Sequence, residues 1–198
     1  GTQVAQKLVD SKVVAVVGHL NSGVTIPASK IYSEAGIVQI SPSSTNPEYT
    51  KQGYKTAYRM VGTDAQQGPV LAKFALETLK GKSIAIVDDA TQYGKGLADE
   101  FEKKIISSGA KIVIHEATNN KATDFKAILT NIKAKNPDII LFGGMAATGG
   151  PFAKQAKELG IKAKIIGGDG ICSPTLYELA GDAVENIICL EIKKYIDF

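Results

Sequence analysis

Short apolar runs alternate with amphipathic segments along the chain from residue 83 onward. The run Ser83–Asp88 (SIAIVD) predicts a strand. Apolar residues then recur at helical spacing, at Leu97, Phe101 and Ile105. Gly109 follows this segment and supplies a left-handed stop, so a helix is expected to end there.

The same pairing of strand and helix repeats in the rest of the chain. Further strands are expected at Lys111–His115, Asp138–Phe142 and Lys164–Ile166. Two apolar stripes predict the intervening helices: Phe125, Ile128, Leu129 and Ile132, then Phe152, Ala153, Ala156 and Leu159. Thr123 or Asp124 is the expected cap of the first helix, Asn136-Pro137 its end, and Gly160 the end of the second. The strands are continuous apolar runs, which is typical of strands buried on both faces of a parallel sheet, so this part of the chain predicts a doubly wound α/β lobe.

Residues 1 to about 60 repeat the pattern less completely. Apolar runs at Val13–Val17, Ile37–Ile40 and Thr56–Met60 provide only two or three strands, with a helix through Ile26 to Glu34 between the first two. A break near Val61–Asp64 precedes a helix that carries Leu71, Phe74 and Leu79. We therefore expect a partial N-terminal lobe over residues 1–63 and a second lobe over 64–190. Residues 191–198 are expected to begin a return crossover or to form a disordered tail.

Composition restricts the classes of partner. Lys and Arg exceed Asp and Glu by only 23 to 20, and basic runs interleaved with aromatic residues are lacking, so nucleic acid is not an expected partner. The apolar runs are too short to cross a bilayer, and no signal-peptide pattern is recognisable. Because the chain starts with Gly1 in a helical pattern, we expect that an upstream segment has been removed.

Loops that follow parallel strands are the expected place for a ligand. The first such loop, Gly18–Thr25, runs into a helix, so its free N–H groups and the Ser22 hydroxyl can hold an anion such as a carboxylate. The second offers Ser43, Ser44 and Thr45 beside Pro42. The alternative for each loop is that Ser and Thr cap only their own backbone.

Two side chains in the second lobe carry similar alternatives. Asp169 stands between glycines after a strand, where it can pair with a ligand ammonium or simply form a turn. Tyr93 can close over a ligand or pack half-buried at the start of a helix. A further loop, Gly143–Thr148, carries no charge.

Enzymatic activity is not expected. The G-x-S-x-G motif of hydrolases and the glycine motifs of nucleotide-binding enzymes do not occur. The only histidines are His19 and His115, and His115 lies within a strand pattern, where packing is the simpler role.

Five motifs in one order give the chain a specific resemblance. They are Gly18–Gly23 (GHLNSG), Pro27–Ser29 (PAS), Ile40–Glu48 (ISPSSTNPE), Gln92–Leu97 (QYGKGL) and Ala180–Ala183 (AGDA). Together they resemble the branched-chain amino acid binding proteins of bacterial ABC transporters. This resemblance implies a two-lobed, type I periplasmic-binding-protein fold with an incomplete first lobe, because family members begin earlier and return to the first lobe after the second.

The resemblance also implies a set of ligand contacts. Ser22 and Thr45 match the hydroxyls that hold the ligand carboxylate, the backbone carbonyl of Ser43 matches one that helps to hold the ammonium, and Ser44 lies in the same loop. Asp169 matches the acidic partner of the ammonium, and Tyr93 matches an aromatic residue that covers the ligand. The chain departs from the family in having Asp169 where well-known members have Glu, and Met145 where they have Tyr.

The implied function is capture of a free neutral L-amino acid, branched-chain or similar, for import through a membrane permease, with no cofactor or metal. The implied location is the periplasm, or the outer face of a Gram-positive cell with a lipid anchor. The alternatives are a ligand-sensing domain of a receptor or regulator with the same fold, or a related amide or aromatic acid as ligand. Cys172 and Cys189 can be two buried thiols or one disulfide, and the implied oxidising compartment favours the disulfide. Exposed sheet edges in the partial lobe are expected to promote self-association.

Overall fold

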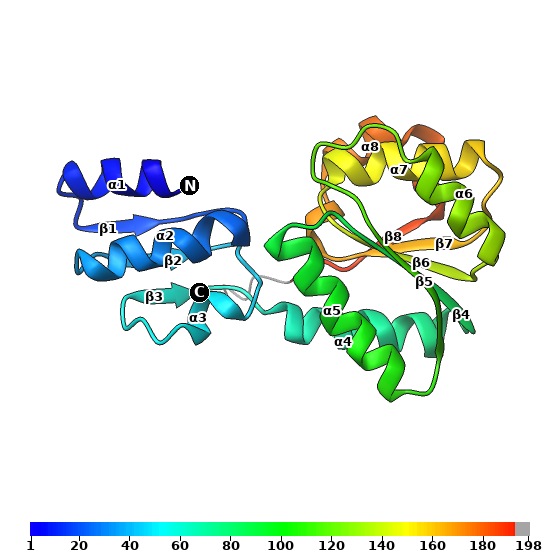
Figure 1. Ribbon diagram of the computed structural model, residues 1–198, viewed down its shortest axis with the longest axis horizontal. Coiled ribbons are helices and arrows are strands. Elements are labelled where there is room, and N and C mark those ends of the chain that lie inside the picture. The colour runs from blue at the N-terminus through cyan, green and yellow to red at the C-terminus, as the bar shows by residue number, and fades with distance from the viewer. Residues whose placement is uncertain (193–198) are drawn as a thin grey trace, which may run out of the picture. The chain divides into compact units, whose positions relative to one another are not determined.

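A computed structural model describes residues 1–192, which form two compact units (Figure 1). The first unit contains Gly1–Ala65, and the second is Gln66–Glu191. Each unit has a parallel sheet of its own. Of the segment 191–198, for which a crossover or tail is predicted, residues 193–198 lie outside the described part of the chain.

The second unit contains a five-stranded sheet in the order β5-β4-β6-β7-β8, and every neighbouring pair is parallel. Its strands are β4 (Ser83–Asp88), β5 (Lys111–Ala117), β6 (Ile139–Gly143), β7 (Lys164–Gly167) and β8 (Ile187–Cys189). The strand order places the carboxyl ends of β4, β6 and β7 side by side. The loops that leave these ends are therefore neighbours although they are far apart in sequence.

Helices cover both faces of this sheet. They are α4 (Asp64–Lys73), which continues as the π-helix η1 (Phe74–Thr78), α5 (Gln92–Ser107), α6 (Lys126–Lys135), α7 (Ala146–Glu158) and α8 (Pro174–Ala180), with the short 3-10 turns η2 (Asp169–Ile171) and η3 (Gly181–Asn186). Figure 1 shows α6, α7 and α8 on one side of the sheet and α4 and α5 on the other. This is the doubly wound arrangement predicted from the sequence.

Alternate residues of each central strand enter different cores. In β4, Ala85 and Val87 pack with Phe125 and Phe152 on one face, whereas Ile84 and Ile86 pack with α5 on the other. Complete burial of a Leu, Ile or Phe side chain contributes about 1.5–3 kcal/mol. Two-sided burial explains why these strands read as unbroken apolar runs.

The predicted helix ends agree with the structure, but one predicted cap is wrong. Gly109 and Gly160 have φ of 75° and 71°, and Asn136 has φ of 45° after the last turn of α6. The N-cap of α6 is Phe125 rather than Thr123 or Asp124. The Asp124 carboxylate instead accepts the amide of Lys126, two residues on, in a local turn.

A disulfide joins Cys172, just after η2, to Cys189 at the end of β8, with their Cα atoms 5.6 Å apart. This confirms the alternative favoured by the resemblance. A crosslink that closes a loop of this length stabilises a fold by roughly 3 kcal/mol. The bond therefore attaches the edge strand β8 to the turn that contains Asp169.

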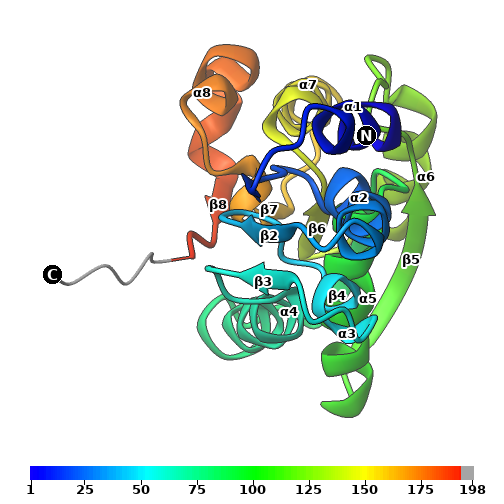
Figure 2. The same cartoon turned by 90° about the vertical axis from the view of Figure 1, so that its left-hand side faces the viewer.

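The first unit contains a three-stranded parallel sheet in the order β1-β2-β3. Its elements are α1 (Thr2–Asp10), β1 (Ala15–Val17), α2 (Ser22–Glu34), β2 (Val38–Ser41), α3 (Glu48–Lys51) and β3 (Ala57–Arg59). Helix α2 packs against α1, β2 and α3 (Figure 2). Between the helices and the strands, a small core gathers Ala5, Val16, Ala28, Tyr32 and Ile37.

Apolar side chains remain exposed around the first sheet. Val14 is 92% exposed and Val17 is 78% exposed, and Leu20, Tyr58 and Met60 are also exposed. In the described part of the chain, β1 therefore has only one covered face and one paired edge. The expectation of a partial sheet with two or three strands is confirmed.

Candidate functional site

The carbonyl oxygen of His19 joins the two loops that leave β1 and β2. It accepts hydrogen bonds from the hydroxyls of Thr25 at 3.1 Å, Ser41 at 3.0 Å and Ser44 at 3.2 Å. These hydroxyls come from the first loop, from the end of β2 and from the second loop. The carbonyl therefore fixes the two loops against each other at one end of the sheet.

The Ser22 hydroxyl bonds to the other loop rather than capping its own helix. Ser22 is the first residue of α2, and its buried Oγ accepts the amide of Asn46 at 3.2 Å. A serine hydroxyl that accepts one hydrogen bond still has a proton to donate. No residue among 1–192 accepts that proton in a hydrogen bond, so Ser22 keeps a donor for an external acceptor.

Thr45 contains the least satisfied hydroxyl of the two loops. The residue is only 1% exposed, yet Oγ1 has no hydrogen-bond partner among residues 1–192. Buried hydroxyls almost always have a partner, because leaving one unpaired costs about 1–3 kcal/mol. The orphan hydroxyl is therefore available to donate to a group outside the described residues.

Ser43 and Ser44 differ from each other in the structure. The Ser44 hydroxyl is engaged with Thr25 and with the carbonyls of His19 and Leu20, so it holds the loop together. The amide of Ser43 lies 3.4 Å from the Ser41 hydroxyl, and within residues 1–192 its carbonyl oxygen accepts no hydrogen bond. Ser43 therefore presents an open acceptor, whereas the Ser44 side chain does not.

Arg59 supports this loop and was not expected from the sequence. From the end of β3, Nη1 donates to the carbonyls of Ser44 at 2.6 Å and Asn46 at 2.9 Å, and Nη2 donates to the Thr50 hydroxyl at 2.8 Å. The guanidinium carbon lies 5.5 Å from the centre of the Tyr49 ring. These donors fix the backbone on both sides of Thr45. A single arginine at the end of a short strand carries no motif, so the sequence offers no signal for this role.

In the second unit, Asp169 begins η2, is separated from the end of β7 by Gly168 alone, and is partly buried. Its Oδ1 accepts two hydrogen bonds, from Nε2 of Gln67 at 2.9 Å and from the Tyr93 hydroxyl at 3.0 Å. Burial raises the pKa of the Asp169 carboxyl, and these two donors oppose that rise without cancelling it. Asp169 is thus more than a turn residue, because two side chains from different helices hold it.

Tyr93 and Met145 pack in the same hydrophobic core cluster of the second unit. The Tyr93 side chain is 7% exposed, and its hydroxyl accepts the amide of Gly170 at 2.8 Å. Met145 precedes α7 and packs against the core cluster that contains Tyr93. Contact of either side chain with a ligand stays a prediction. Thr91, in contrast, is an ordinary cap, because its hydroxyl accepts the amide of Gly94 at 3.0 Å.

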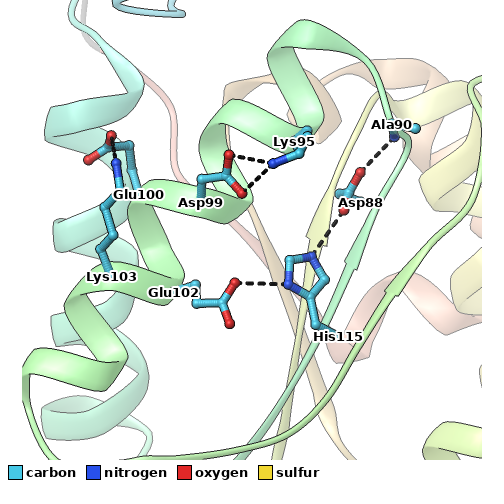
Figure 3. A network of polar contacts seen from close by, with 8 residues as sticks. All are labelled: Asp88, Ala90, Lys95, Asp99, Glu100, Glu102, Lys103 and His115. Atoms are coloured by element: carbon cyan, nitrogen blue, oxygen red, sulfur yellow. Dashed lines mark hydrogen bonds and ion pairs between the residues drawn. The ribbon is translucent and has the colours of Figure 1, made fainter.

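The histidines make hydrogen bonds that suit structural roles. His115 lies between two carboxylates, with Nε2 3.0 Å from Oδ2 of Asp88 and Nδ1 2.9 Å from Oε2 of Glu102 (Figure 3). His19 Nε2 lies 3.0 Å from the Tyr32 hydroxyl. Within residues 1–192, no group of three His, Cys, Asp or Glu side chains is arranged to hold a metal ion. No helix in this described range is long and apolar enough to cross a membrane.

The seven predicted site residues therefore fall into two groups. Ser22, Ser43, Ser44 and Thr45 share one end of the first sheet, and Tyr93, Met145 and Asp169 share one end of the second. The first group offers the hydroxyl donors of Ser22 and Thr45, which suit a carboxylate. The second group offers a carboxylate held by neutral donors, which suits a cation.

Solved structures with the same fold define the class of protein. The crystal structure of a leucine-binding protein LivK from Thermotoga maritima matches with a TM-score of 0.89 at 31% identity, over 92% of this chain and 52% of that one. The branched-chain amino acid transporter substrate-binding protein LivJ from Streptococcus pneumoniae, solved in complex with isoleucine, matches with a TM-score of 0.87 at 34% identity, over 95% of this chain and 54% of that one. The type I periplasmic-binding-protein fold predicted from the motifs is thus confirmed.

The chain belongs to the periplasmic binding protein family, whose sequence profile matches residues 1–192. A Leu/Ile/Val-binding protein homolog 1 of Brucella abortus is 43% identical over 188 residues, which are 95% of this chain and 51% of that protein. A leucine-, isoleucine-, valine-, threonine- and alanine-binding protein of Pseudomonas aeruginosa is 39% identical over 93% of this chain and 50% of that protein. The resemblance to branched-chain amino acid binding proteins is confirmed, and the chain spans about half the length of these relatives.

Proposed function

We propose that the complete protein captures a free neutral L-amino acid, and that the hydroxyls of Ser22 and Thr45 donate to the ligand carboxylate. The observation that carries this proposal is the buried Thr45 hydroxyl without a partner. Asn46, the next residue along the loop, donates its amide to the Ser22 hydroxyl, so the two loops that carry these hydroxyls are hydrogen-bonded to each other. A carboxylate accepts hydrogen bonds from two such donors readily, and charge-assisted bonds of this kind are about twice as strong as neutral ones.

The ammonium group of the ligand is assigned to Asp169, with help from the open carbonyl of Ser43. Burial raises the pKa of the Asp169 carboxyl, and a cationic partner favours its ionised form. A ligand without an amine would leave Asp169 unpaired, at a cost of roughly 2–5 kcal/mol. Selection for the amine follows from this difference.

The side-chain preference is proposed from the relatives. Their names specify leucine, isoleucine, valine and, in one case, threonine and alanine. We assign the aliphatic side chain of the ligand to the neighbourhood of Tyr93 and Met145, and give Ser44 the task of holding the second loop. Met145 in place of a family tyrosine then changes the size of the pocket.

The proposed role in the cell is delivery of the amino acid to the membrane permease of an ABC importer. The family name supports the periplasm as location, and in a Gram-positive organism the equivalent place is the outer face of the membrane with a lipid anchor. Neither cofactor nor metal is required, and no turnover of the ligand is expected. Incubation with aliphatic amino acid amides and esters, followed by chromatography, tests for turnover.

Isothermal titration calorimetry on the complete gene product, with L-leucine, L-isoleucine, L-valine and L-alanine, tests the binding role. Thr45→Val keeps the shape of the side chain but removes the hydroxyl, so affinity should fall about tenfold or more, as for a lost hydrogen bond to a charged group. Asp169→Asn should reduce affinity at least as much.

The control is Thr130→Val, which removes a hydroxyl that bonds only the Lys126 carbonyl of its own helix. This variant should bind like the unmodified protein. Full affinity in both Thr45→Val and Asp169→Asn would contradict the site assignment, and absence of binding to all four amino acids would contradict the proposed ligand.

A further inference from the structure

Gln67 makes a two-point contact with Asp169. Its Nε2 donates to Oδ1 of Asp169 at 2.9 Å, and its Oε1 accepts the backbone amide of the same residue at 3.1 Å. Gln67 itself is buried in α4. One side chain therefore fixes both the backbone and the carboxylate of Asp169.

Tyr93 makes a second two-point contact from α5. Its hydroxyl donates to the same Oδ1 at 3.0 Å and accepts the amide of Gly170 at 2.8 Å. Both donors thus converge on one oxygen of the carboxylate. Within residues 1–192, no side chain donates a hydrogen bond to the other oxygen, Oδ2, and Oδ2 is not among their fully buried orphan atoms. The backbone amides of Asp169 and Gly170 also lower the pKa of this carboxyl.

The glycines beside Asp169 allow this close approach. A Cβ atom on Gly168 would lie 2.9 Å from the Tyr93 hydroxyl and 3.0 Å from Oε1 of Gln67. On Gly170 it would lie 2.5 Å from a ring carbon of Tyr93. The sequence G-D-G is thus required by the two contacts, and not only by the turn.

We propose that Gln67 and Tyr93 are positioning residues that occupy Oδ1 of Asp169 and leave Oδ2 as the single oxygen that receives the ligand ammonium. This inference rests on the proposed function, and it adds a specificity rule. A single carboxylate oxygen suits a compact primary ammonium, whereas a guanidinium pairs best with both oxygens at once. The donors also lower the pKa of the carboxyl against the effect of burial, which favours the ionised form.

Gln67→Glu is the sharpest test because it changes only one end of the side chain. The new carboxylate can still accept the Asp169 amide, but it places an oxygen where Nε2 donated, so two carboxylates compete for a proton. The pKa of Asp169 should rise relative to the unmodified protein, and affinity for L-leucine at pH 7.5 should fall about tenfold or more. Tyr93→Phe should shift both quantities in the same direction.

Two matched controls are available in the same unit. Gln155 has the same two-point geometry elsewhere, with Nε2 2.8 Å from the Thr123 carbonyl and Oε1 2.8 Å from the Phe125 amide. Gln155→Glu should leave the pKa of Asp169 and the affinity unchanged. Tyr177→Phe, at an exposed tyrosine of α8, controls for the loss of a phenolic hydroxyl.

NMR titration of the aspartate carboxyl carbons in the 198-residue chain, without ligand, measures the pKa of Asp169. The chain is labelled with ¹³C at aspartate, and the Asp169 signal is assigned as the one that disappears in Asp169→Asn. Calorimetry on the complete gene product measures the affinity. Circular dichroism checks that each variant is folded.

The two measurements separate the possible failures. A raised pKa with lowered affinity in Gln67→Glu and Tyr93→Phe supports the proposal. An unchanged pKa in both variants, or a raised pKa with unchanged affinity, overturns it. A third outcome is that the unmodified protein binds no amino acid although the pKa of Asp169 responds to the variants as expected. The proposed function and the assignment of Oδ2 to an ammonium then both fail, while the hydrogen-bonding role of Gln67 stands.

Discussion

At the scale of single residues, His115 is the clearest case of a side chain whose role follows from its neighbours. Its hydrogen bond with Asp88, and then that with Glu102, raise the pKa of the imidazole although burial opposes the rise. For Asp88, burial alone would raise the pKa, but hydrogen bonds from His115 and from the Ala90 amide outweigh it and the pKa is lowered. The pair joins β5 to the end of β4, where the loop to Tyr93 starts, and the Lys95–Asp99 ion pair lies close by (Figure 3).

The stability contributed by this pair should depend on pH in a defined direction. Because the pKa of His115 is raised on folding, its contribution to the free energy of unfolding is complete below pH 6.5 and is lost as pH rises through the pKa of the folded protein. Because the pKa of Asp88 is lowered on folding, its contribution to the free energy of unfolding is present above pH 3.8 and is lost as pH falls through the pKa of the folded protein. The difference in thermal midpoint between the unmodified protein and His115→Gln should therefore be largest at about pH 5–6 and should shrink toward pH 9. For a partly exposed pair this difference corresponds to on the order of 1 kcal/mol or less of unfolding free energy.

His19→Gln provides a control with the opposite sign. Burial lowers the pKa of His19, so its contribution is present above 6.5 and is lost as pH falls. A constant difference between the unmodified protein and His115→Gln from pH 5 to 9 would show that the ion pair contributes nothing.

The candidate site residues that the sequence could offer are those whose side-chain chemistry is visible in a motif, and their contact with a ligand stays a prediction. Ser22, Thr45 and Asp169 stand in loops after apolar strands, and the structure gives each a setting that suits a ligand contact. Gln67 and Arg59 were missed because their role depends on which distant loop they touch. Gln67 is 102 positions from Asp169 in the chain, and no local pattern encodes such a pairing.

At the scale of elements, helices α4 and α5 approach each other unusually closely at Gly68. A Cβ atom there would lie 2.6 Å from the backbone nitrogen of Phe101 and 2.7 Å from the carbonyl carbon of Glu100. The absence of a side chain lets Gln67, the preceding residue, sit deep in the unit. Gly68 therefore supports both the packing of the helices and the position of Asp169.

Gly68→Ala should destabilise the protein although alanine favours helix. The gain in helix propensity is about 1 kcal/mol, but separating two packed helices costs typically 1–3 kcal/mol and also strains the neighbouring contacts. A lower midpoint in thermal unfolding by circular dichroism is expected. Ser107→Ala, at an exposed position near the end of α5, should leave the midpoint unchanged or slightly higher. Equal midpoints for Gly68→Ala and unmodified protein would show that the helices can separate at no cost.

The central strands β4, β6 and β7 could be predicted because they are buried on both faces, so their sequences are largely apolar. The short elements α8 and β8 were not predicted from the sequence. The ends of helices were also predictable wherever a glycine or asparagine in the left-handed conformation follows the last turn. The predicted cap of α6 was wrong, because the Asp124 carboxylate accepts the amide of Lys126 in a local turn and the helix starts at least one residue later than expected. In the first unit, the predicted run Val13–Val17 is longer than β1, since Val14 is turned to solvent and forms no ladder.

At the scale of the whole molecule, the two units differ in how completely they bury their apolar surface. The second unit covers both faces of its sheet, whereas the first exposes Val14, Val17, Tyr58 and Met60. Burial of apolar surface drives association as well as folding. Exposed apolar groups next to an unpaired strand edge favour contact with a second copy.

The 198-residue chain should therefore self-associate through its first unit. Sedimentation velocity should show larger species as the protein concentration rises through the micromolar range. Val17→Lys should shift the distribution toward monomer, because a lysine on the uncovered face of β1 must lose its hydration when a second chain packs there. Ile106→Lys replaces another exposed apolar side chain, on α5 of the second unit, and should leave the distribution unchanged. A chain that stays monomeric at every concentration would show that the first unit tolerates its exposed apolar face. An equal effect of both lysine variants would show that the association depends on net charge rather than on the edge of β1.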